Sequence, residues 1–573
     1  MAAGSALYPS ATRSPVARTS AMRIAAFALL LAGTAASAGE PPRFGRFAYD
    51  GHAQEQVRVG PGQYRNPILS GYYPDPSVTR VGDDYYLVLS SFAHYPGLPI
   101  FKSKDLVNWT QIGNAIDRPE QLDFTGMRTS QAVFAPDISF HDGLFYIVNT
   151  CVECKGNFVI TAKDPAGPWS NPIWLPFEGI DPSIYWEGDK AYIVNNRAPA
   201  EPPRYDGHRA IWIQEYDWRA GKMVGDSTQL INGGVDISKK PVWIEGPHIF
   251  RKDGYYYLTA AEGGTSVNHS QVALRSKSLR GPYIPFAGNP ILTQRDLDPA
   301  RPNPITSTGH AKLVQTQNGD WYATFLGVRP YEGDYYNIGR ETFLLPVTWK
   351  DGWPIILPKG QPVPFAATKP KLPASPPSRI PTSGDFRYVD SFDGSKLAMQ
   401  WVGVRTPKTP FYRLEGGDLV LDRGGRIGDL SRVPSFVGRR QQHHVATMST
   451  TVRFAPDTDG DRAGLVAMQS DANFLFFGIT RVAGKPVVAL YTTDKGTERL
   501  VASAPVMGSG PVTLTIRADG GTMAFDYDGA GDGAGDSAGS KRTLARDVDA
   551  RFLSTKTAGG FVGTLVGPYA WMK

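Results

Sequence analysis

Apolar and polar residues alternate along most of the chain, in short runs that are rich in β-branched and aromatic side chains. In the first half, one unit occurs five times: a strand that opens on a polar residue, a turn of the Asp-Gly or Asn-Gly type, and two further strands. Such strands joined by such turns predict β-hairpins. The units recur at intervals of about 44 to 65 residues, which suits four-stranded blades, so the pattern predicts a five-bladed β-propeller over residues 61–361.

A polar residue opens the innermost strand of each predicted blade. Blades pack around a central axis, so these five residues are expected at the mouth of the central channel. They are Asp75, Asp137, Asp181, Glu245 and His310.

The second half of the chain has a different organisation. Residues 362–384 contain seven prolines, and we expect an extended connector that forms no β-ladder. Beyond it, alternating runs without a helical period predict a β-sandwich over residues 385–573. These runs are 419–421, 445–454, 474–479, 487–491, 512–516 and 561–566. The whole chain is therefore expected to be all-β.

The first 38 residues contain no acidic residue, and the apolar run 24–32 follows Arg23 and precedes Ala36-Ser37-Ala38. This pattern predicts a signal peptide cleaved after Ala38, with Met22 as an alternative start, and hence an exported protein, periplasmic or secreted. No later stretch holds 18 consecutive apolar residues, which argues against a membrane-resident protein.

Charge and cysteine content exclude further classes. The net charge is +6, and three of the arginines lie in the predicted signal peptide, so the remaining excess indicates no nucleic-acid partner. Cys151 and Cys154 are the only cysteines, and no second ligand pair follows at zinc-site spacing. They form either a local disulfide or two free thiols.

Acidic residues that open several inner strands converge on one pocket, and this arrangement suits the cleavage of a glycosidic bond. One carboxylic acid protonates the leaving oxygen, a carboxylate on the other face activates water, and a third charge keeps the acid protonated. Alternatively, Asp75 and Asp181, each followed by Pro-Ser, cap turns that enter a strand. The repetition of Asp-Pro-Ser, with Glu245-Gly246-Pro247-His248 at the matching blade position, favours a site.

Over residues 65–573 the chain resembles glycoside hydrolase family 43, in its β-xylosidase-like branch with a C-terminal sandwich. The resemblance rests on six motifs in order along the chain. They are Asn66-Pro67-Ile68 with Tyr73-Pro74-Asp75-Pro76-Ser77, Ser103-Lys104-Asp105-Leu106-Val107-Asn108-Trp109, Gly179-Ile180-Asp181-Pro182-Ser183, Glu245-Gly246-Pro247-His248, Ser307-Thr308-Gly309-His310 and Gly339-Arg340-Glu341-Thr342.

The resemblance implies roles for three carboxylates. Asp75 matches the general base, Glu245 the general acid, and Asp181 the third carboxylate, which tunes the acid and orients the sugar. Asp137 is not catalytic in this family, and we interpret it as structural.

The same resemblance implies further residues of the site. Arg340 is similar to the arginine that reaches the sugar pocket, with a surface ion pair as the alternative. Phe92 is similar to the aromatic wall of the pocket, with a core position as the alternative. His310 resembles a histidine that contacts a calcium ion or water near the propeller axis, with an ordinary buried histidine as the alternative.

Two positions depart from the family pattern. Phe134 stands where relatives often carry Trp, which weakens stacking on the sugar, and Ile180 stands where some relatives have an aromatic residue, which alters the inner pocket.

The resemblance implies exo-acting hydrolysis with inversion, which needs no organic cofactor. The expected substrates are xylooligosaccharides that lose terminal β-D-xylose, or arabinose-bearing oligosaccharides that lose α-L-arabinofuranose; the sequence leaves this preference and the oligomeric state open. An endo-arabinanase is an alternative, and the sandwich argues against its open groove. A noncatalytic carbohydrate-binding propeller is another, and the intact carboxylate triad argues against it.

Overall fold

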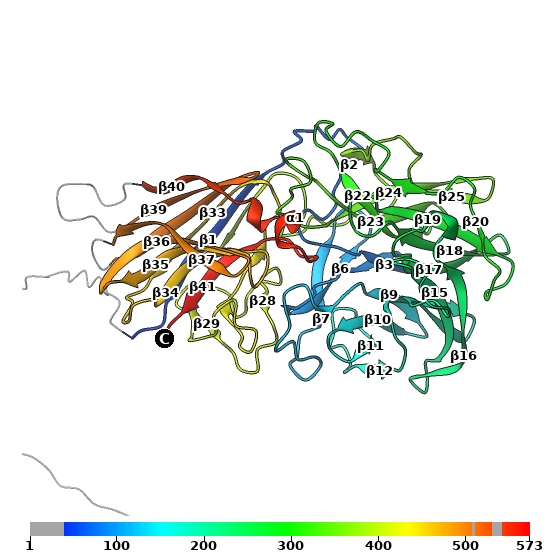
Figure 1. Cartoon of the computed structure of the whole chain (residues 1–573), viewed down its shortest axis with the longest axis horizontal. Helices are drawn as coiled ribbons and strands as arrows, with labels where there is room; N and C mark the ends of the chain where they lie inside the picture. The colour runs from blue at the N-terminus through cyan, green and yellow to red at the C-terminus, as the bar shows by residue number, and fades with distance from the viewer. Residues whose placement is uncertain (1–38, 507–509, 530–540) are drawn as a thin grey trace, which may run out of the picture. The chain divides into compact units, whose positions relative to one another are not determined.

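The structure is a computed structural model that describes residues 39–506, 510–529 and 541–573, so the predicted signal peptide lies outside the described residues. Five four-stranded antiparallel sheets follow one another along the chain and form a propeller, as predicted (Figure 1). Their strands are β3 (Ser77–Val81), β4 (Asp84–Val88), β6 (Gly97–Ser103) and β7 (Thr110–Ile116); β9 (Asp137–His141), β10 (Leu144–Val152), β11 (Gly156–Ala162) and β12 (Ile173–Leu175); β13 (Ile180–Glu187), β14 (Lys190–Arg197), β15 (Ala210–Asp217) and β16 (Lys222–Asn232); β17 (Glu245–Lys252), β18 (Tyr255–Glu262), β19 (Ser270–Ser276) and β20 (Ile284–Pro285); and β22 (Thr306–Gln315), β23 (Trp321–Val328), β24 (Glu341–Lys350) and β25 (Trp353–Ile355). Two short strands, β8 (Ala132–Val133) and β21 (Leu292–Thr293), extend the second and fourth sheets.

The turns explain why these hairpins form where they do. Asp142 and Gly143 have φ angles of 46° and 77°, and Asp253 and Gly254 have φ angles of 49° and 73°. Two successive positive φ angles define the type I′ turn, whose twist matches that of the flanking strands. The Asp-Gly pairs in the sequence therefore set the first hairpin of their blades.

The ring of blades is closed by the segment that precedes the first blade. Ile68 N–H donates to the Thr342 carbonyl at 2.9 Å, and Tyr73 N–H donates to the Arg340 carbonyl at 2.9 Å. This segment thus lies along the last blade before the chain enters the first. One consequence is that Asp75, which follows Tyr73 closely, is brought beside Arg340.

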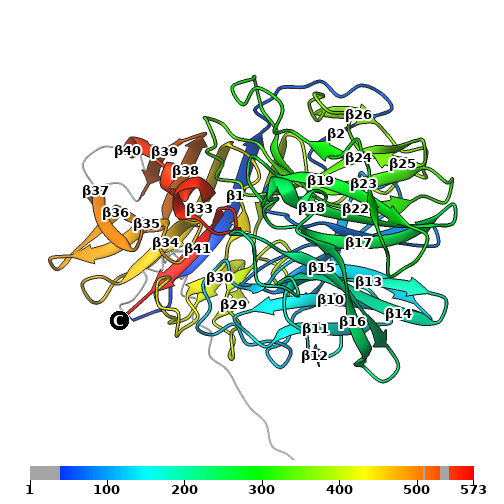
Figure 2. The same ribbon diagram turned by 45° about the vertical axis from the view of Figure 1, so that its right-hand side comes forward.

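Two further sheets form the C-terminal sandwich (Figures 1 and 2). One contains β29 (Tyr412–Glu415), β30 (Asp418–Leu421), β1 (Arg43–His52), β33 (Val445–Arg453), β38 (Val512–Asp519), β39 (Thr522–Asp528) and β40 (Arg542–Asp549), with β27 (Phe386–Asp390) against β1. The other contains β31 (Ser435–Phe436), β41 (Leu565–Trp571), β34 (Arg462–Met468), β35 (Phe474–Val482), β36 (Lys485–Asp494) and β37 (Thr497–Pro505), with β32 (Arg439–Arg440) against β41.

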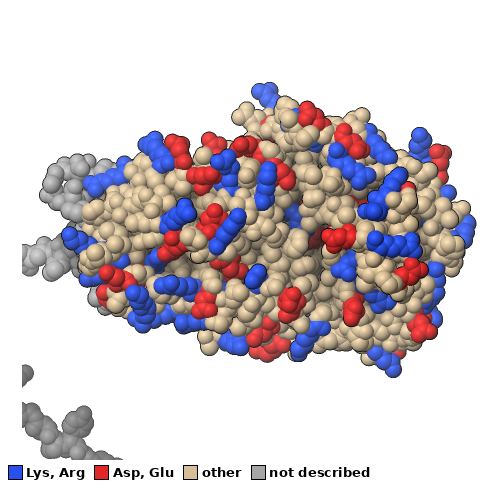
Figure 3. Space-filling model, in the orientation of Figure 1, with Lys and Arg blue, Asp and Glu red and all other residues tan. Residues whose placement is uncertain are grey.

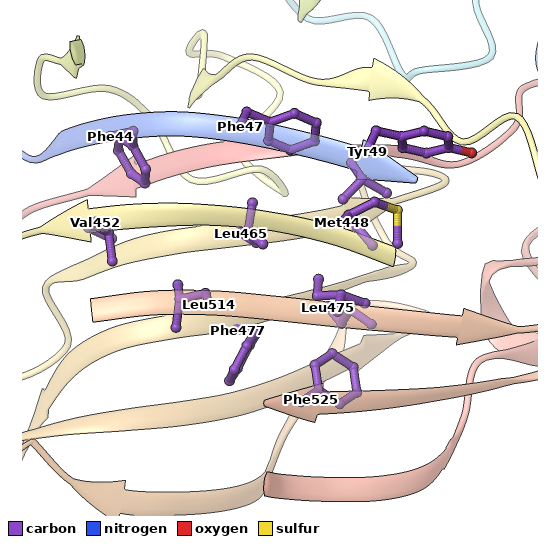
Figure 4. Packing of buried hydrophobic residues seen from close by; sticks show 14 of the residues in the cluster. Phe44, Phe47, Tyr49, Met448, Val452, Leu465, Leu475, Phe477, Leu514 and Phe525 are labelled. Atoms are coloured by element: carbon purple, nitrogen blue, oxygen red, sulfur yellow. The ribbon is translucent and has the colours of Figure 1, made fainter. Parts of the chain in front are cut away.

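Strand β1 precedes the propeller in the chain but belongs to the sandwich, which the sequence pattern predicts only for residues 385–573. It pairs with β33 through Phe47↔Thr450 and Tyr49↔Met448. Phe44, Phe47 and Tyr49 are fully buried in the sandwich core, where they pack with residues of β33, β34, β35, β38 and β39 (Figure 4). The sandwich is therefore built from both ends of the described chain.

The proline-rich stretch also differs from expectation. Residues 366–368, which contain no proline, form β26 (Ala366–Thr368) and pair with β2 (Gln63–Arg65), so the stretch does form a short β-ladder. Farther along, Ser375 N–H donates to the Asp105 carboxylate at 3.0 Å. The stretch is thus packed against the propeller by specific contacts.

The remaining elements are few. Strand β28 (Gly403–Val404), from the chain after the connector, pairs with β5 (His94–Tyr95) of the propeller. The short helices are η1 (Ile237–Lys239), η2 (Arg551–Leu553) and α1 (Thr555–Ala558), and none of the described helices has the length and apolarity to cross a membrane.

Cys151 and Cys154 form a disulfide. Positive and negative side chains are interspersed on the face in Figure 3.

Candidate active site

The side chains that open the inner strands are aimed by an unusual backbone. Asp75, Asp181 and His310 have φ angles of 54°, 53° and 50°, in the left-handed region that non-glycine residues rarely adopt. The ladders shift register between Ile180 and Ser183 of β13, and again beside Glu245 of β17. Such bulges re-aim side chains at functional sites. At least one of these two features therefore occurs at the start of the first, third, fourth and fifth blades.

These residues line one cavity of about 60 Å³. It contains every site residue proposed from the sequence, and also three that were not. The lining residues are Asp75, Phe92, Phe134, Ala135, Ile180, Asp181, Glu245, Thr265, His310, Arg340 and Phe561.

Asp75 is held as a hydrogen-bond acceptor on both oxygens. Arg340 donates from Nη1 to Oδ1 at 2.9 Å and from Nη2 to Oδ2 at 3.2 Å, and Ser90 Oγ donates to Oδ2 at 2.5 Å. A bidentate guanidinium is the geometry that fixes a carboxylate most firmly. Asp75 is 5% exposed, so its carboxylate has a fixed direction in a nearly closed site.

The surroundings of Glu245 favour its protonated form. Burial raises its pKa well above the usual value, and the negative charges of Asp181 and Asp75 raise it further, against the opposing charges of Arg340 and Arg209. Burial also raises the pKa of Asp181, whose Oδ2 accepts a hydrogen bond from Gly246 N–H at 3.2 Å. The group thus combines a protonated carboxylic acid with a clamped carboxylate, which is the pair that glycosidic cleavage requires.

An aromatic wall encloses the other side of the cavity. Phe92 stacks on Phe561 at a ring distance of 5.7 Å and meets Phe134 edge-on at 5.1 Å. The Arg340 guanidinium binds Asp75 and also lies near two aromatic rings. Its Cζ is 5.7 Å from the Phe92 ring and 5.4 Å from the Phe561 ring. Apolar walls around a guanidinium and carboxylates exclude water and strengthen their interactions.

Ala135, Thr265 and Phe561 were not predicted as lining residues, and the last two share a local signal. Thr265 follows Gly263 and Gly264, and Phe561 follows Gly559 and Gly560; all four glycines have positive φ. Thr265 is close enough for a 3.4 Å contact with Arg340 Nη1, and the Phe561 N–H donates to Ser130 Oγ at 3.0 Å. A paired glycine lets the chain turn sharply and present the next side chain, but the pattern alone does not identify its target.

Asp137 does not line this cavity. It is 1% exposed and accepts hydrogen bonds from Ser77 Oγ at 2.8 Å, from Ile184 N–H at 3.0 Å and from the Lys312 ammonium. Burial alone would raise the pKa of Asp137. The Lys312 ammonium and the hydrogen bonds have the opposite and larger effect, so the pKa of Asp137 lies below the usual value. Asp137 therefore ties blades together beneath the site.

His310 lies at the site, with Nδ1 3.6 Å from Asp75 Oδ1. Its ring also fills the space beside Gly246, where a Cβ atom would lie 2.7 Å from Nε2. Calcium takes six to eight oxygen ligands. Among the described residues no group of three or more His, Cys, Asp or Glu could hold a metal ion, and the guanidinium of Arg340 already occupies the Asp75 carboxylate. The residues therefore do not fit a protein-ligated calcium ion.

The propeller and the acid–carboxylate cavity define a glycoside hydrolase. Residues 64–354 match the family described as glycosyl hydrolases family 43, and residues 389–573 match the beta xylosidase C-terminal concanavalin A-like domain. The chain belongs to glycosyl hydrolase family 43, which confirms the resemblance drawn from its motifs.

Two relatives of known name and one solved structure align with nearly the whole length of this chain. The chain is 38% identical to a xylosidase/arabinosidase of Butyrivibrio fibrisolvens, over 88% of this chain and 95% of that protein. It is 37% identical to a non-reducing end alpha-L-arabinofuranosidase of Bacteroides ovatus, over 90% and 92%. A crystal structure of a GH43_12 protein retrieved from a capybara gut metagenome superposes with a TM-score of 0.85 at 38% identity, over 93% and 100%.

Proposed function

We propose that the protein is an exo-acting, inverting hydrolase that releases terminal β-D-xylose from xylooligosaccharides and also accepts terminal α-L-arabinofuranose. The observation that carries the proposal is the small cavity in which a raised-pKa Glu245 and a clamped Asp75 carboxylate lie together, closed by Phe561. Phe561, from the C-terminal domain, forms part of the cavity wall. It supports chain-end cleavage over the open groove of an endo-arabinanase, and the charged triad is unnecessary for a noncatalytic binding propeller.

The chemistry follows a single displacement. Asp75 takes a proton from water as the water oxygen bonds to the anomeric carbon, and the bond from that carbon to the leaving oxygen breaks. Glu245 gives its proton to the leaving oxygen, so one water is consumed per bond cleaved. Arg340 holds the Asp75 carboxylate in place, and the negative charge of Asp181 raises the pKa of Glu245. These steps need no organic cofactor.

The sugar is the open part of the proposal. Relatives of nearly equal similarity carry the names xylosidase/arabinosidase and alpha-L-arabinofuranosidase, so α-L-arabinofuranose is the second candidate. Terminal xylose and arabinofuranose present similar hydroxyl positions, and one pocket can accept both.

The test compares two glycosides and one oligosaccharide. The intact protein is assayed on 4-nitrophenyl β-D-xyloside and 4-nitrophenyl α-L-arabinofuranoside, and early products from xylohexaose are separated by chromatography. We expect hydrolysis of at least the xyloside and release of single sugars. Activity on neither glycoside would reject the proposed function, and a dominant pool of middle-length oligosaccharides would reject exo-action.

We also propose that the protein is exported after cleavage behind Ala38. The first described residue is Gly39 and β1 begins at Arg43, so the proposed cleavage leaves every described strand intact. Mass spectrometry of the mature protein should find an N-terminus at Gly39. A retained N-terminal segment would contradict this.

A further inference from the structure

The segment that carries the proposed general base lies outside the ladder of its blade. Asp75 stands between two prolines, and the first strand of the blade, β3, begins only after them. Proline has no N–H group, so neither neighbour can donate a main-chain hydrogen bond. Just before them, the Tyr73 N–H donates to the Arg340 carbonyl at 2.9 Å. The direction of Asp75 therefore depends on how residues 71–73 are held.

The sandwich packs directly against this part of the propeller backbone. A Cβ atom at Gly71 would lie 2.7 Å from the Gln441 carbonyl oxygen, and a Cβ atom at Gly339 would lie 2.8 Å from the Gly563 Cα. At both places the main chains of the two domains therefore touch. Gly71 lies shortly before the proposed base in the chain, and Gly339 lies immediately before Arg340. The sandwich thus supports the backbone beside both members of the clamped ion pair.

One sandwich side chain, Arg440, holds the same segment by specific contacts. It lies in β32, which pairs with β41 through Arg440↔Leu565, and it is buried. Its Nε donates to the Tyr72 carbonyl at 2.6 Å, and its Cζ lies 4.4 Å over the Tyr73 ring. One guanidinium thus fixes two successive residues, by a hydrogen bond and by a cation–π contact. The Tyr72 ring in turn stacks on Phe92 of the aromatic wall at a ring distance of 6.3 Å.

We propose that Arg440 is a positioning residue for the general base, because by holding Tyr72 and Tyr73 it keeps the Asp75 carboxylate directed at the attacking water. The inference rests on the proposed function and assigns part of the base's alignment to a side chain of the sandwich. Arg440 does not line the catalytic cavity, so it acts through the propeller segment and not on the sugar. A displacement of about 1 Å between reacting groups can cost about 10²-fold in rate.

The neighbouring Arg439 provides a matched control. It is equally buried and lies on the same two-residue strand, but its contacts are within the sandwich. Its Cζ lies 4.5 Å over the Tyr49 ring, and its Nη2 donates to Gln442 Oε1 at 2.8 Å. Arg439→Met therefore removes a buried guanidinium from the same place in the sandwich and leaves the contacts of Arg440 with the propeller segment in place.

The test measures kcat and KM of Arg440→Met, Arg440→Lys and Arg439→Met, each at a temperature at which the variant is folded. The substrates are xylobiose and 4-nitrophenyl β-D-xyloside, with the corresponding arabinofuranosides if these are preferred. We expect kcat of Arg440→Met to fall at least about tenfold on both substrates, by a similar factor and with a smaller change in KM, because water must be activated whichever group leaves. Arg440→Lys keeps a donor for the carbonyl and should recover part of the loss. Arg439→Met should keep kcat.

Several outcomes would overturn the inference. Equal losses in Arg440→Met and Arg439→Met would mean that the sandwich is disturbed in general, and a loss on xylobiose alone would mean that Arg440 acts on the acid side. If Arg440→Met does not fold, Arg440→Lys decides: a kcat equal to that of the unmodified protein would reject the positioning role, and a reduced kcat at an unchanged unfolding temperature would support it. Inactivity of the unmodified protein on both glycosides would reject the proposed function itself, whereas normal activity in folded Arg440→Met would remove this inference alone.

Discussion

At the scale of single residues, the site separates two carboxyl groups by their surroundings. Asp75 has a guanidinium on both oxygens, whereas Glu245 has carboxylates as its strongest neighbours and a raised pKa. These surroundings suit Asp75 to the proposed role of general base and Glu245 to the proposed role of general acid.

The first prediction separates these roles by leaving group. Glu245→Ala and Asp75→Ala should each lower kcat on xylobiose by roughly 10²–10⁴-fold, the usual contribution of general acid or base catalysis. A glycoside with a very good leaving group needs little protonation, so it should partly restore the Glu245→Ala rate and leave the Asp75→Ala rate low. Glu215→Ala, which changes a carboxylate paired with Lys190 on the surface, is the control. Similar rescue of both site variants would contradict the assignment.

The second prediction concerns Asp181. The groups whose charge acts on Glu245 are Asp181 and Asp75, which raise its pKa, and Arg340 and Arg209, which lower it. Asp181→Asn removes a raising charge, so the pKa of the acid falls. Because the acid must be protonated to act, the alkaline limb of the pH profile of kcat/KM should move to lower pH. An alkaline limb at the same pH, measured on a substrate with a poor leaving group, would argue against this tuning role.

At the scale of elements, one strand and one connecting segment lie in places that the sequence pattern does not predict. Strand β1 pairs with β33, β30 and β27, so it is internal to its sheet although it precedes the propeller in sequence. Residues 561–564, predicted as the start of a strand over 561–566, instead precede β41 (Leu565–Trp571), and Phe561 lines the cavity.

The third prediction tests the contribution of β1 to stability. Phe47 is fully buried, so Phe47→Ala should lower the free energy of unfolding of the sandwich by about 3–5 kcal/mol through lost burial and a cavity. Arg46→Ala, which changes the exposed neighbour on the same strand, should alter it by less than about 0.5 kcal/mol. Thermal or denaturant unfolding of the intact chain measures both. Equal, small effects would show that β1 is dispensable.

At the scale of the whole molecule, the propeller alone does not complete the site. Phe561 of the C-terminal domain stacks on Phe92, and its N–H donates to Ser130 Oγ of the propeller. The pairing of β28 with β5 adds a backbone connection between the same domains. The sandwich is therefore expected to shape the pocket as well as to stabilise the protein.

The fourth prediction follows from that contact. Phe561→Ala opens the cavity wall and exposes the Asp75–Arg340 pair to water, so kcat/KM on xylobiose should fall at least about tenfold while the unfolding temperature changes little, because Phe561 is only half-buried. Phe561→Leu keeps an apolar wall and should retain more activity. Removal of residues 385–573 should abolish activity. Full activity of Phe561→Ala would mean that the sandwich is not part of the site.

The sequence by itself determined the blades and led to the proposed reacting groups, because Asp-Gly turns, strand periodicity and the motifs around Asp75, Asp181 and Glu245 are local signals. Only the tertiary structure decided what surrounds them. Phe561 meets Arg340 across 221 residues, and β1 joins strands about 400 residues away. Such contacts depend on how two domains pack, and packing of buried side chains has no periodicity along the chain from which it could be predicted.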